Sequence, residues 1–217
     1  MTLFCPAATR YRRPMARAAT YDRNDALDAA MRLFWTKGYH ATSMKDLEQT
    51  LSMRPGSIYA AFHSKEQLFR ETLDRYSARM EADLTRLVMQ SPAPLKALQS
   101  HLLSLADLTP CDRPSTACML VKSLLELPQD GELRDFITDH LDRVEALIAA
   151  ALKRSAQLGE LRDSCDPDRL ARRIQTYIFG LKIQAQRQKD PQRMQELCGD
   201  LAEELGRIGG GAVARTT

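Results

Sequence analysis

The stretch TSMKDLEQTLSMRPGSIYAAFHSK, residues 42–65, decides how this chain folds. Met44, Leu47 and Leu51 recur at i, i+3 and i+7, which predicts a short helix with one apolar face. Pro55 suits the first turn of a second helix, because its missing N–H needs no partner there. The stretch therefore predicts two short helices separated by a tight turn.

The ends of these helices carry capping signals. Thr42 or Ser43 can cap the first helix, because a hydroxyl can accept a bond from an otherwise unpaired backbone N–H. The turn itself is expected at residues 52–54. A third helix follows, and Ser64 and Gln67 have the S-x-x-Q spacing of a capping box at its start.

Two short helices around a tight turn form a helix-turn-helix, whose second helix is the right size for a DNA major groove. Arg54 can hydrogen-bond guanine, and Tyr59 and Lys65 can reach phosphates. The small residues between them would let the backbone approach base edges. The predicted DNA-binding residues are Thr42, Ser43, Arg54, Pro55, Ser57, Tyr59, Ala60, His63 and Lys65.

These residues resemble the DNA-binding domain of the TetR family of bacterial transcriptional regulators. The family pattern has a Thr opening the first helix of the motif, then Gly-x-[Leu/Ile]-Tyr-x-x-Phe and a Lys three residues further. Here its members are Thr42, Gly56, Ile58, Tyr59, Phe62 and Lys65, with Phe34, Gly38 and Tyr39 at the end of the preceding helix. The chain departs from the family at Glu48 and at residues 51–53, where Ser52 replaces the usual Gly and suggests a slightly different turn. The departures leave the operator sequence undetermined.

The resemblance implies an all-α fold of about nine helices, three in the DNA-binding part and six behind it. We expect a basic disordered arm at 1–19, a helix-turn-helix domain at 20–66, a helical effector and dimerisation domain at 67–209 and a disordered tail at 210–217. The resemblance also implies a one-component repressor that binds a palindromic operator as a homodimer and responds to an unidentified small molecule.

The charge distribution agrees with DNA binding by the N-terminal part. Residues 1–65 hold ten Lys or Arg against five Asp or Glu, whereas residues 66–217 hold 21 against 23. A basic end on a slightly acidic body is what phosphate binding requires, although surface asymmetry also arises by chance. No window holds the ~18 apolar residues of a membrane helix, and no signal peptide is evident, so we expect a cytoplasmic protein.

The basic stretch at residues 1–19 has three interpretations. It can be an arm that follows the DNA backbone or enters a minor groove. The simpler interpretation is a disordered basic tail, because such tails are common. Translation can also begin at Met15, which would remove most of it.

Apolar periodicity predicts helices along the rest of the chain and no strand of useful length. The expected helices span residues 22–37, 64–90, 95–108, 115–127, 133–158, 166–189 and 191–209. The helix at 64–90 is long enough to connect the DNA-binding part to the body. Trp35 is expected to pack within the DNA-binding bundle and not to contact a ligand.

The last two helices carry a wide apolar stripe. One chain can bury this stripe internally, or two copies can form a four-helix interface, as the resemblance implies. Gly180 would let a partner helix approach closely. The predicted interface residues are Ile174, Tyr177, Ile178, Leu181, Ala185, Leu197, Leu201 and Leu205.

The body is expected to hold an effector pocket with mostly apolar walls. The candidates, each of which can also be plain core, are Met80, Leu84, Leu103, Cys118, Met119, Lys122, Phe136 and Tyr177. Lys122 and Glu126, at i and i+4, can form a surface ion pair or face the pocket.

Two cysteines are candidates for sensing an electrophile or oxidant. Cys111 precedes Arg113 and a predicted helix start, and Cys118 lies near the first turn of that helix. A helix N-terminus or a nearby cation lowers a thiol pKa, but a buried inert cysteine is the simpler interpretation.

Other function classes have little support. The five cysteines include no C-x-x-C, and the four histidines have no H-E-x-x-H spacing, so we expect no metal site and no cofactor. P-loop, G-x-S-x-G and G-x-G-x-x-G motifs are also absent, which argues against an enzyme. The alternative to a regulator is a helical interaction protein without specific DNA binding. Arg54, Tyr59 and Lys65 argue against it, and steep salt dependence of DNA binding would exclude it.

Overall fold

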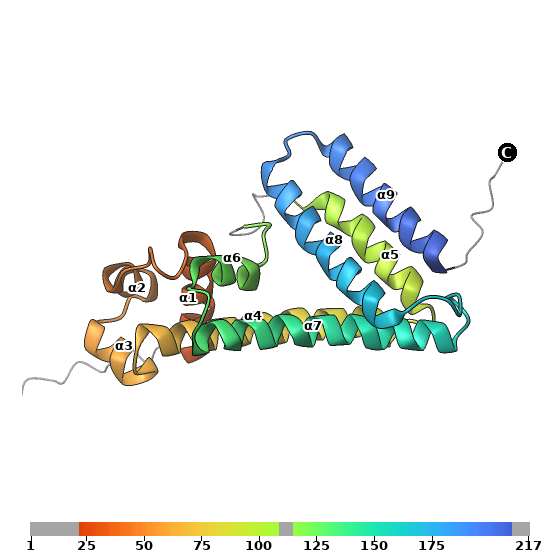
Figure 1. Cartoon of the computed structure of the whole chain (residues 1–217). Helices are drawn as coiled ribbons and strands as arrows, with labels where there is room; N and C mark the ends of the chain where they lie inside the picture. Colours follow the sequence, from red (N-terminus) through yellow and green to blue (C-terminus); the bar gives the residue numbers. More distant parts are fainter. Residues whose placement is uncertain (1–21, 109–114, 210–217) are drawn as a thin grey trace, which may run out of the picture.

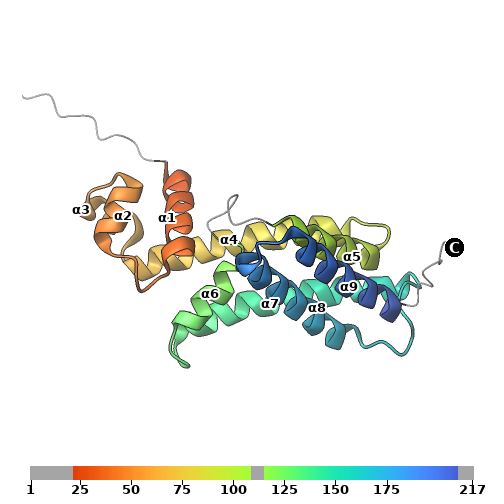
Figure 2. The ribbon, with the colours of Figure 1, turned by 90° about the horizontal axis from the view of Figure 1, so that it is seen from above.

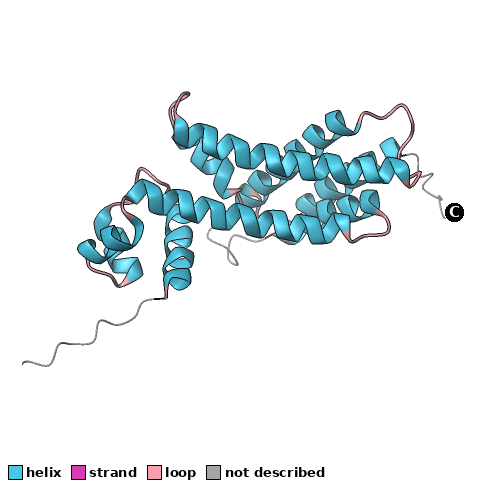
Figure 3. Ribbon diagram, turned by 90° about the horizontal axis from the view of Figure 1, so that it is seen from below, coloured by secondary structure: helices cyan, strands magenta, loops and turns pink. Residues whose placement is uncertain are grey.

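The computed structural model describes residues 22–108 and 115–209, and within these ranges it contains helices and no strand (Figure 3). The all-α prediction is confirmed. The helices are α1 (Arg23–Lys37), α2 (Met44–Leu51), α3 (Pro55–Phe62), α4 (Lys65–Met89), α5 (Pro94–Ser104) with the 3-10 turn η1 (Leu105–Asp107), α6 (Met119–Glu126), α7 (Glu132–Gln157), α8 (Pro167–Arg187) and α9 (Pro191–Gly209).

The helices begin at the signals that the sequence carries. Ser64 accepts a hydrogen bond from the Gln67 backbone N–H at 2.9 Å and caps α4. Asp166 accepts bonds from two backbone N–H groups of α8, with Pro167 at the first helical position. Gly38 ends α1 with a φ of 91°, a left-handed value that favours glycine.

One expected helix starts later than the sequence suggests. Residues 115–118 were predicted as the first turn of a helix, but α6 begins at Met119. The Thr116 backbone N–H donates to Gln186 Oε1 at 3.0 Å, and its hydroxyl donates to the Lys182 carbonyl at 2.8 Å. The Thr116 N–H and hydroxyl thus have partners on α8 and not within a helical turn of their own segment. These bonds hold the segment in a non-helical conformation.

Helices α1, α2 and α3 form a group at one end of α4 (Figure 1). Helix α4 continues beyond this group and packs along α7, while α5, α8 and α9 pack together at the far end (Figure 2). The short α6 lies between the N-terminal group and the body and contacts both α4 and α7. This placement gives α6 contact with the two parts of the molecule at once.

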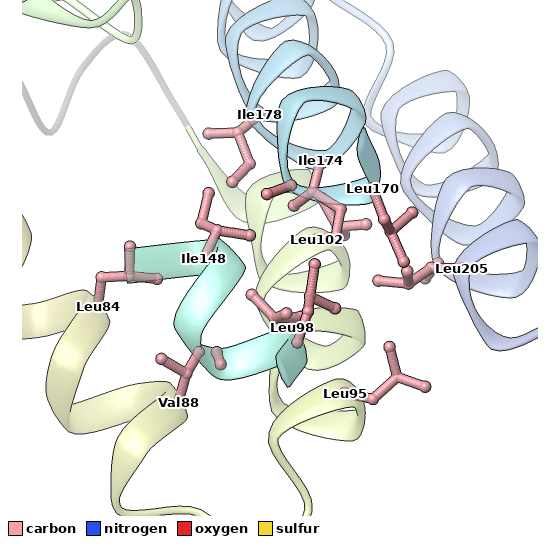
Figure 4. Packing of buried hydrophobic residues seen from close by; sticks show 14 of the residues in the cluster. Leu84, Val88, Leu95, Leu98, Leu102, Ile148, Leu170, Ile174, Ile178 and Leu205 are labelled. Carbon is pink, nitrogen blue, oxygen red and sulfur yellow. The ribbon is translucent and has the colours of Figure 1, made fainter. Parts of the chain in front are cut away.

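The buried apolar residues form two clusters. One lies among α4, α5, α7, α8 and α9 and includes Leu98, Leu102 and Ile148 (Figure 4). The other lies around α1 to α4 and also includes Met119 and Leu120 of α6. The second cluster therefore crosses the expected division of the chain near residue 66, so the two parts share buried surface.

Several expectations lie outside the described residues. These are the basic arm at 1–19, the tail at 210–217 and Cys111. Among the residues that the structure describes, no helix is both long and apolar enough to cross a membrane. The same residues contain no group of three or more His, Cys, Asp or Glu side chains placed to hold a metal ion.

Candidate DNA-binding face and interior cavity

The helix-turn-helix is held by its own local contacts. Ser43, not Thr42, caps α2: its Oγ accepts the Asp46 N–H at 3.2 Å, and its own N–H donates to Asp46 Oδ2 at 2.7 Å. A hydrogen bond from Lys37, with further bonds from Ser43, holds the pKa of Asp46 well below its usual range. Ser52 takes the left-handed conformation, φ 52°, that glycine would otherwise supply at this turn. The turn thus forms despite the departure from the family pattern.

Helix α3 has one buried side and one exposed side. Ile58 and Phe62 are buried against the neighbouring helices. Tyr59 is 49% exposed and is one of the large apolar side chains left at the surface. The other predicted contact residues on the exposed side are Arg54, Pro55, Ser57, Ala60 and His63. All six side chains are therefore exposed on or beside α3, and Ser43 at the start of α2 is exposed as well.

Two predicted contacts are placed differently. Thr42 is 1% exposed, and its hydroxyl donates to the Gly38 carbonyl at 2.6 Å, so it joins α1 to α2 and does not reach the surface. Its prediction as a DNA contact is corrected for this reason. Lys65 is half-buried with its Nζ 4.5 Å from the centre of the Tyr39 ring, and burial lowers its pKa.

Hydrogen bonds join the end of α1 to α6, and we call this set the α1–α6 junction. Lys122 Nζ donates to the Trp35 carbonyl at 2.6 Å. Glu126 Oε2 accepts the Tyr39 N–H at 2.8 Å. In the other direction, Trp35 Nε1 donates to the Ala117 carbonyl at 2.8 Å. Neither predicted role of Lys122 and Glu126 holds, because both side chains instead bind backbone at the end of α1.

A cavity of about 1010 Å³ that is partly open to solvent lies between α1, α4, α5, α7 and α8. Its aromatic walls are Trp35, Tyr76 and Phe179, and the Trp35 and Tyr76 rings meet edge to face at 5.1 Å. Trp35 was predicted to pack within the DNA-binding bundle and not to contact a ligand, but its side chain also lines the cavity. The charged and imidazole side chains in the lining are Arg79, Asp83, Arg86, His101 and Lys182. The cavity therefore touches the DNA-binding part directly through α1.

Most predicted pocket residues lie elsewhere. Met80 and Leu84 line the cavity. Leu103 is exposed, while Cys118 and Met119 are buried in the cluster around α1 to α4. Three further predicted pocket residues are also placed elsewhere. The Phe136 ring packs edge-on against the His140 ring, and the Tyr177 hydroxyl donates to Glu204. Lys122 belongs to the α1–α6 junction.

The sequence did not single out the polar cavity residues, because His101 and Lys182 lie on helices that are far apart in the chain. Burial, followed by the positive charge of Lys182, lowers the pKa of His101 to about 4. The imidazole is therefore neutral near pH 7, with one ring nitrogen able to donate and the other able to accept.

The predicted interface stripe is largely internal to one chain. Ile174, Ile178 and Leu205 point into the same core as Leu98 and Leu102 (Figure 4). Leu181 and Ala185 are buried there as well, while Tyr177, Leu197 and Leu201 are partly buried at its edge. The prediction is corrected for the five buried residues, which belong to the core because their own chain already covers them: Ile174, Ile178, Leu181, Ala185 and Leu205.

A different face of α8 is left at the surface. Ile183 is 49% exposed, and Thr176 and Gly180 lie on the same exposed side of the helix. Apart from its chain neighbours and the backbone of its own helix, no atom lies within 4 Å of the position that a Cβ at Gly180 would take. This strip was missed because periodicity identifies the apolar face of a helix but not a small exposed one.

Of the two sensor candidates, Cys118 is described. It is the N-cap residue of α6 and is 2% exposed. The Tyr76 hydroxyl donates to its Sγ at 3.6 Å. The thiol is thus enclosed behind a residue of the cavity wall.

Comparisons with known proteins agree with this geometry. A model of the bacterial regulatory proteins of the tetR family matches residues 26–72, and a model of the tetracyclin repressor-like C-terminal domain matches residues 92–199. The HTH-type transcriptional repressor ComR of Escherichia coli (strain K12) is 30% identical over 186 residues, 84% of this chain and 88% of that protein. The fatty acid metabolism regulator protein of Bacillus subtilis (strain 168) is 27% identical over 159 residues, which are 71% of this chain and 76% of that protein.

A solved structure is also similar over nearly the whole chain. It is the TetR family transcriptional regulator CifR, a cysteine mutant complexed with a 26-base-pair double-strand operator DNA. The TM-score is 0.77 at 28% identity, and the match covers 89% of this chain and 100% of CifR.

Proposed function

This chain belongs to the TetR family of bacterial transcriptional regulators, and on that premise we propose that it is a repressor that binds a palindromic operator as a homodimer. We further propose that a small molecule in the interior cavity releases it from DNA. The observation that carries the proposal is the surface of α3, where Arg54, Ser57 and Tyr59 are exposed after the turn at Ser52.

Several features support DNA binding through α3. An α-helix fits the major groove, and Arg54 at its start is free of any side-chain capping bond. CifR, which is similar over nearly its whole length, is solved with operator DNA. In this proposal Tyr59, which is exposed, contacts a phosphate of the operator, and Lys65 does so only by leaving the Tyr39 ring. The competing interaction-protein hypothesis gives no reason for this grouping of side chains.

The homodimer is supported by the exposed strip of α8. Ile183 would lose its contact with water in an interface, and Gly180 would allow close approach of a second helix. A two-fold dimer would present two α3 helices to half-sites about 34–36 Å apart. The two-fold symmetry of the dimer explains why such a repressor would read an inverted repeat, and the spacing sets the distance between its half-sites.

Release by a ligand is supported by the position of the cavity. Met31 and Trp35 of α1 form part of its wall, so a bound molecule would contact the DNA-binding part itself. Trp35 also belongs to the α1–α6 junction. A ligand that favours one arrangement of this junction would shift the population between conformations that fit the operator and conformations that do not.

Thiol chemistry is the second route to release. CifR was solved as a cysteine mutant, and Cys118 lies behind Tyr76 of the cavity wall. Burial of Cys118 favours reversible binding in the cavity over reaction with an electrophile. Unchanged release by quinones or peroxide in Cys118→Ser and Cys111→Ser would remove the thiol route.

Selection of bound duplexes from a random library tests the proposed function. We expect wild-type protein to enrich an inverted repeat with steeply salt-dependent affinity, and Tyr59→Ala to bind the selected duplex more weakly. Enrichment of no sequence, together with no binding at low salt, would instead favour the interaction protein.

A further inference from the structure

We propose that the cavity selects an uncharged molecule with an aromatic body. The rings of this molecule would lie against Trp35, Tyr76 and Phe179, and its head group would carry no charge. Two properties of the lining carry the inference: its polar and charged groups are engaged within the protein, and its aromatic rings are grouped. The inference rests on the proposed function, because it names the chemical class of the effector.

The polar atoms of two wall rings already have partners within the protein. Trp35 Nε1 donates to the Ala117 carbonyl at 2.8 Å. The Tyr76 hydroxyl donates to Cys118 Sγ at 3.6 Å. Both rings therefore present carbon surface to the cavity, and a charged head group beside them would lose its hydration without gaining a hydrogen bond from either ring.

The charged side chains of the lining are paired as well. Arg79 lies 2.7 Å from Asp28, and Arg86 lies 2.6 Å from Asp83. The Arg86 and Asp83 side chains are 67% and 73% exposed, so this pair lies at the rim of the cavity. Lys182 is not without a partner either. An ion inside the cavity would therefore stay unpaired or break an existing pair, and both are unfavourable.

The imidazole in the wall adds no charge near neutral pH. Burial, followed by the charge of Lys182, lowers the pKa of His101 to about 4. A neutral imidazole can donate to, or accept from, an uncharged hydroxyl group. A hydroxyl group on the ligand is therefore compatible with this wall.

The aromatic rings of the wall favour an aromatic body. Trp35 and Tyr76 meet edge to face at 5.1 Å, and Phe179 belongs to the same lining. Met31 and Met80 add thioether sulfurs, which also contact rings favourably. Contacts between rings stabilise beyond the apolar area that they bury. The volume of about 1010 Å³ is at the upper end of the range for small-molecule pockets, so a naphthalene body fits with room to spare.

The chain provides its own probe of occupancy. Trp35 is its one tryptophan and lies in the cavity wall, so its fluorescence reports on a ligand placed beside it. The full-length protein is titrated with 2-naphthalenemethanol, 2-naphthoate and 2-naphthylmethylammonium at pH 7.5, and calorimetry gives the affinities. The three probes share one aromatic body and differ in the charge of the head group.

We expect the alcohol to bind at least about 10-fold more tightly than either ion, because a buried charge without a partner is unfavourable. Equal or tighter binding of the carboxylate or of the ammonium ion would overturn the proposal. Absence of binding by the alcohol up to its solubility would overturn it as well.

Variants test the aromatic part of the inference. The second ligand is decahydro-2-naphthalenemethanol, the saturated counterpart of the alcohol. Phe179→Leu keeps the wall apolar but removes a ring, so it should weaken binding of the aromatic alcohol about 2- to 10-fold more than binding of the saturated one. If Phe179→Leu does not fold, Phe179→Ile takes its place.

The matched control is Phe136→Leu, which removes a partly buried ring that lies outside the cavity lining. This variant should leave the ratio of the two affinities unchanged. An unchanged ratio in the folded Phe179 variant, or an equal change in the Phe136 variant, would overturn the assignment of the aromatic body to this wall.

Failure of this inference and failure of the proposed function are distinguishable. Operator binding is measured on the same protein without any ligand, so loss of selectivity for the uncharged probe leaves the DNA result standing. Selectivity for the uncharged probe without operator binding would instead support the cavity assignment and overturn the repressor.

Discussion

The carboxylate of Glu126 accepts a hydrogen bond from the backbone N–H of Tyr39, with the two atoms 2.8 Å apart and the residues 87 positions apart in the chain. Glu126 is the last residue of α6, and Tyr39 lies in the connection from α1 to α2. The same carboxylate also accepts the His40 N–H at 3.4 Å. A side chain of the body thus holds the backbone immediately before the helix-turn-helix.

Removing the Glu126 carboxylate should expose this backbone. In Glu126→Ala we expect the amides of Tyr39 and His40 to exchange hydrogen faster with solvent, because they lose their acceptor. Hydrogen-exchange mass spectrometry of peptides that span residues 35–43 measures this. Glu203→Ala, an exposed carboxylate on α9, is the matched control. Equal exchange in both variants would mean that the Glu126 bond does not hold the segment.

Adding a methyl group at Gly38 should strain the same place. Gly38 has a φ of 91°, and a Cβ there would fall on the Glu126 carboxylate, which hydrogen bonds keep from moving away. We expect Gly38→Ala to lower the free energy of unfolding by about 1–3 kcal/mol, as measured by urea denaturation. In the Glu126→Ala background the cost should fall by about 0.5 kcal/mol or more. If the losses of unfolding free energy in the two single variants simply add in the double variant, the Cβ at residue 38 does not meet the Glu126 carboxylate.

Substitutions on α3 should separate sequence reading from phosphate binding. We expect Arg54→Ala to lose about 1–3 kcal/mol at one base position of the operator and to relax the preference there. Tyr59→Ala should weaken binding to specific and random duplexes alike. Fluorescence anisotropy with single-base variants of the operator measures both effects. Equal losses on specific and random DNA for Arg54→Ala would refute its role in reading a base.

The exposed strip of α8 should control assembly. We expect Ile183→Asp to give monomers in analytical ultracentrifugation and to lose tight operator binding, since a charge would be buried in the interface. Leu181→Ala, two residues earlier but inside the core, should instead lower stability by about 2–5 kcal/mol without changing the oligomeric state of the folded fraction. A dimer that persists in Ile183→Asp would place the interface elsewhere.

His101 should make stability depend on pH. Its pKa falls from an ordinary value near 6.5 to about 4 on folding, so the unfolded chain takes up the proton first. The stability is therefore complete above pH 6.5 and declines as the pH falls toward 4. Between pH 7.5 and 5 this one group should cost about 1–2 kcal/mol. The measurement is urea denaturation at both pH values.

The matched comparison for this effect is His101→Gln, which should lose less stability over the same interval. His140 also has a lowered pKa, because of burial and the nearby Arg143, so the difference between the two proteins is the informative quantity. Parallel pH profiles for wild type and His101→Gln would show that folding does not lower the pKa of His101.

The helix-turn-helix could be predicted because its signals are local. The cap at Thr42 or Ser43, the turn at residues 52–54 and Pro55 at the start of α3 act over a few residues, and the structure has Ser43 as the cap, Ser52 at the turn and Pro55 as the first residue of α3. The exposed side of α3 followed from the period of Ile58 and Phe62. Thr42 was misplaced, because the sequence does not tell whether its hydroxyl donates to DNA or to a backbone carbonyl, and here it donates to the Gly38 carbonyl.

The body was harder, because its sites depend on which helix covers which face. The stripe that contains Ile174 and Leu181 is apolar whether a partner or its own chain buries it, and only the packing of α5 and α7 decides. The cavity combines Trp35, His101 and Lys182 from three distant segments. No spacing in the sequence relates these residues, so periodicity could not find them.

The most direct test of the proposed repressor is a footprint on the selected duplex, combined with the mass of the complex. The account predicts two protected major-groove segments related by two-fold symmetry, with centres about 34–36 Å apart, and an even number of chains bound. Protection of a single segment by one chain would contradict the dimeric account. Absence of protection at any salt concentration would contradict DNA binding by α3 itself.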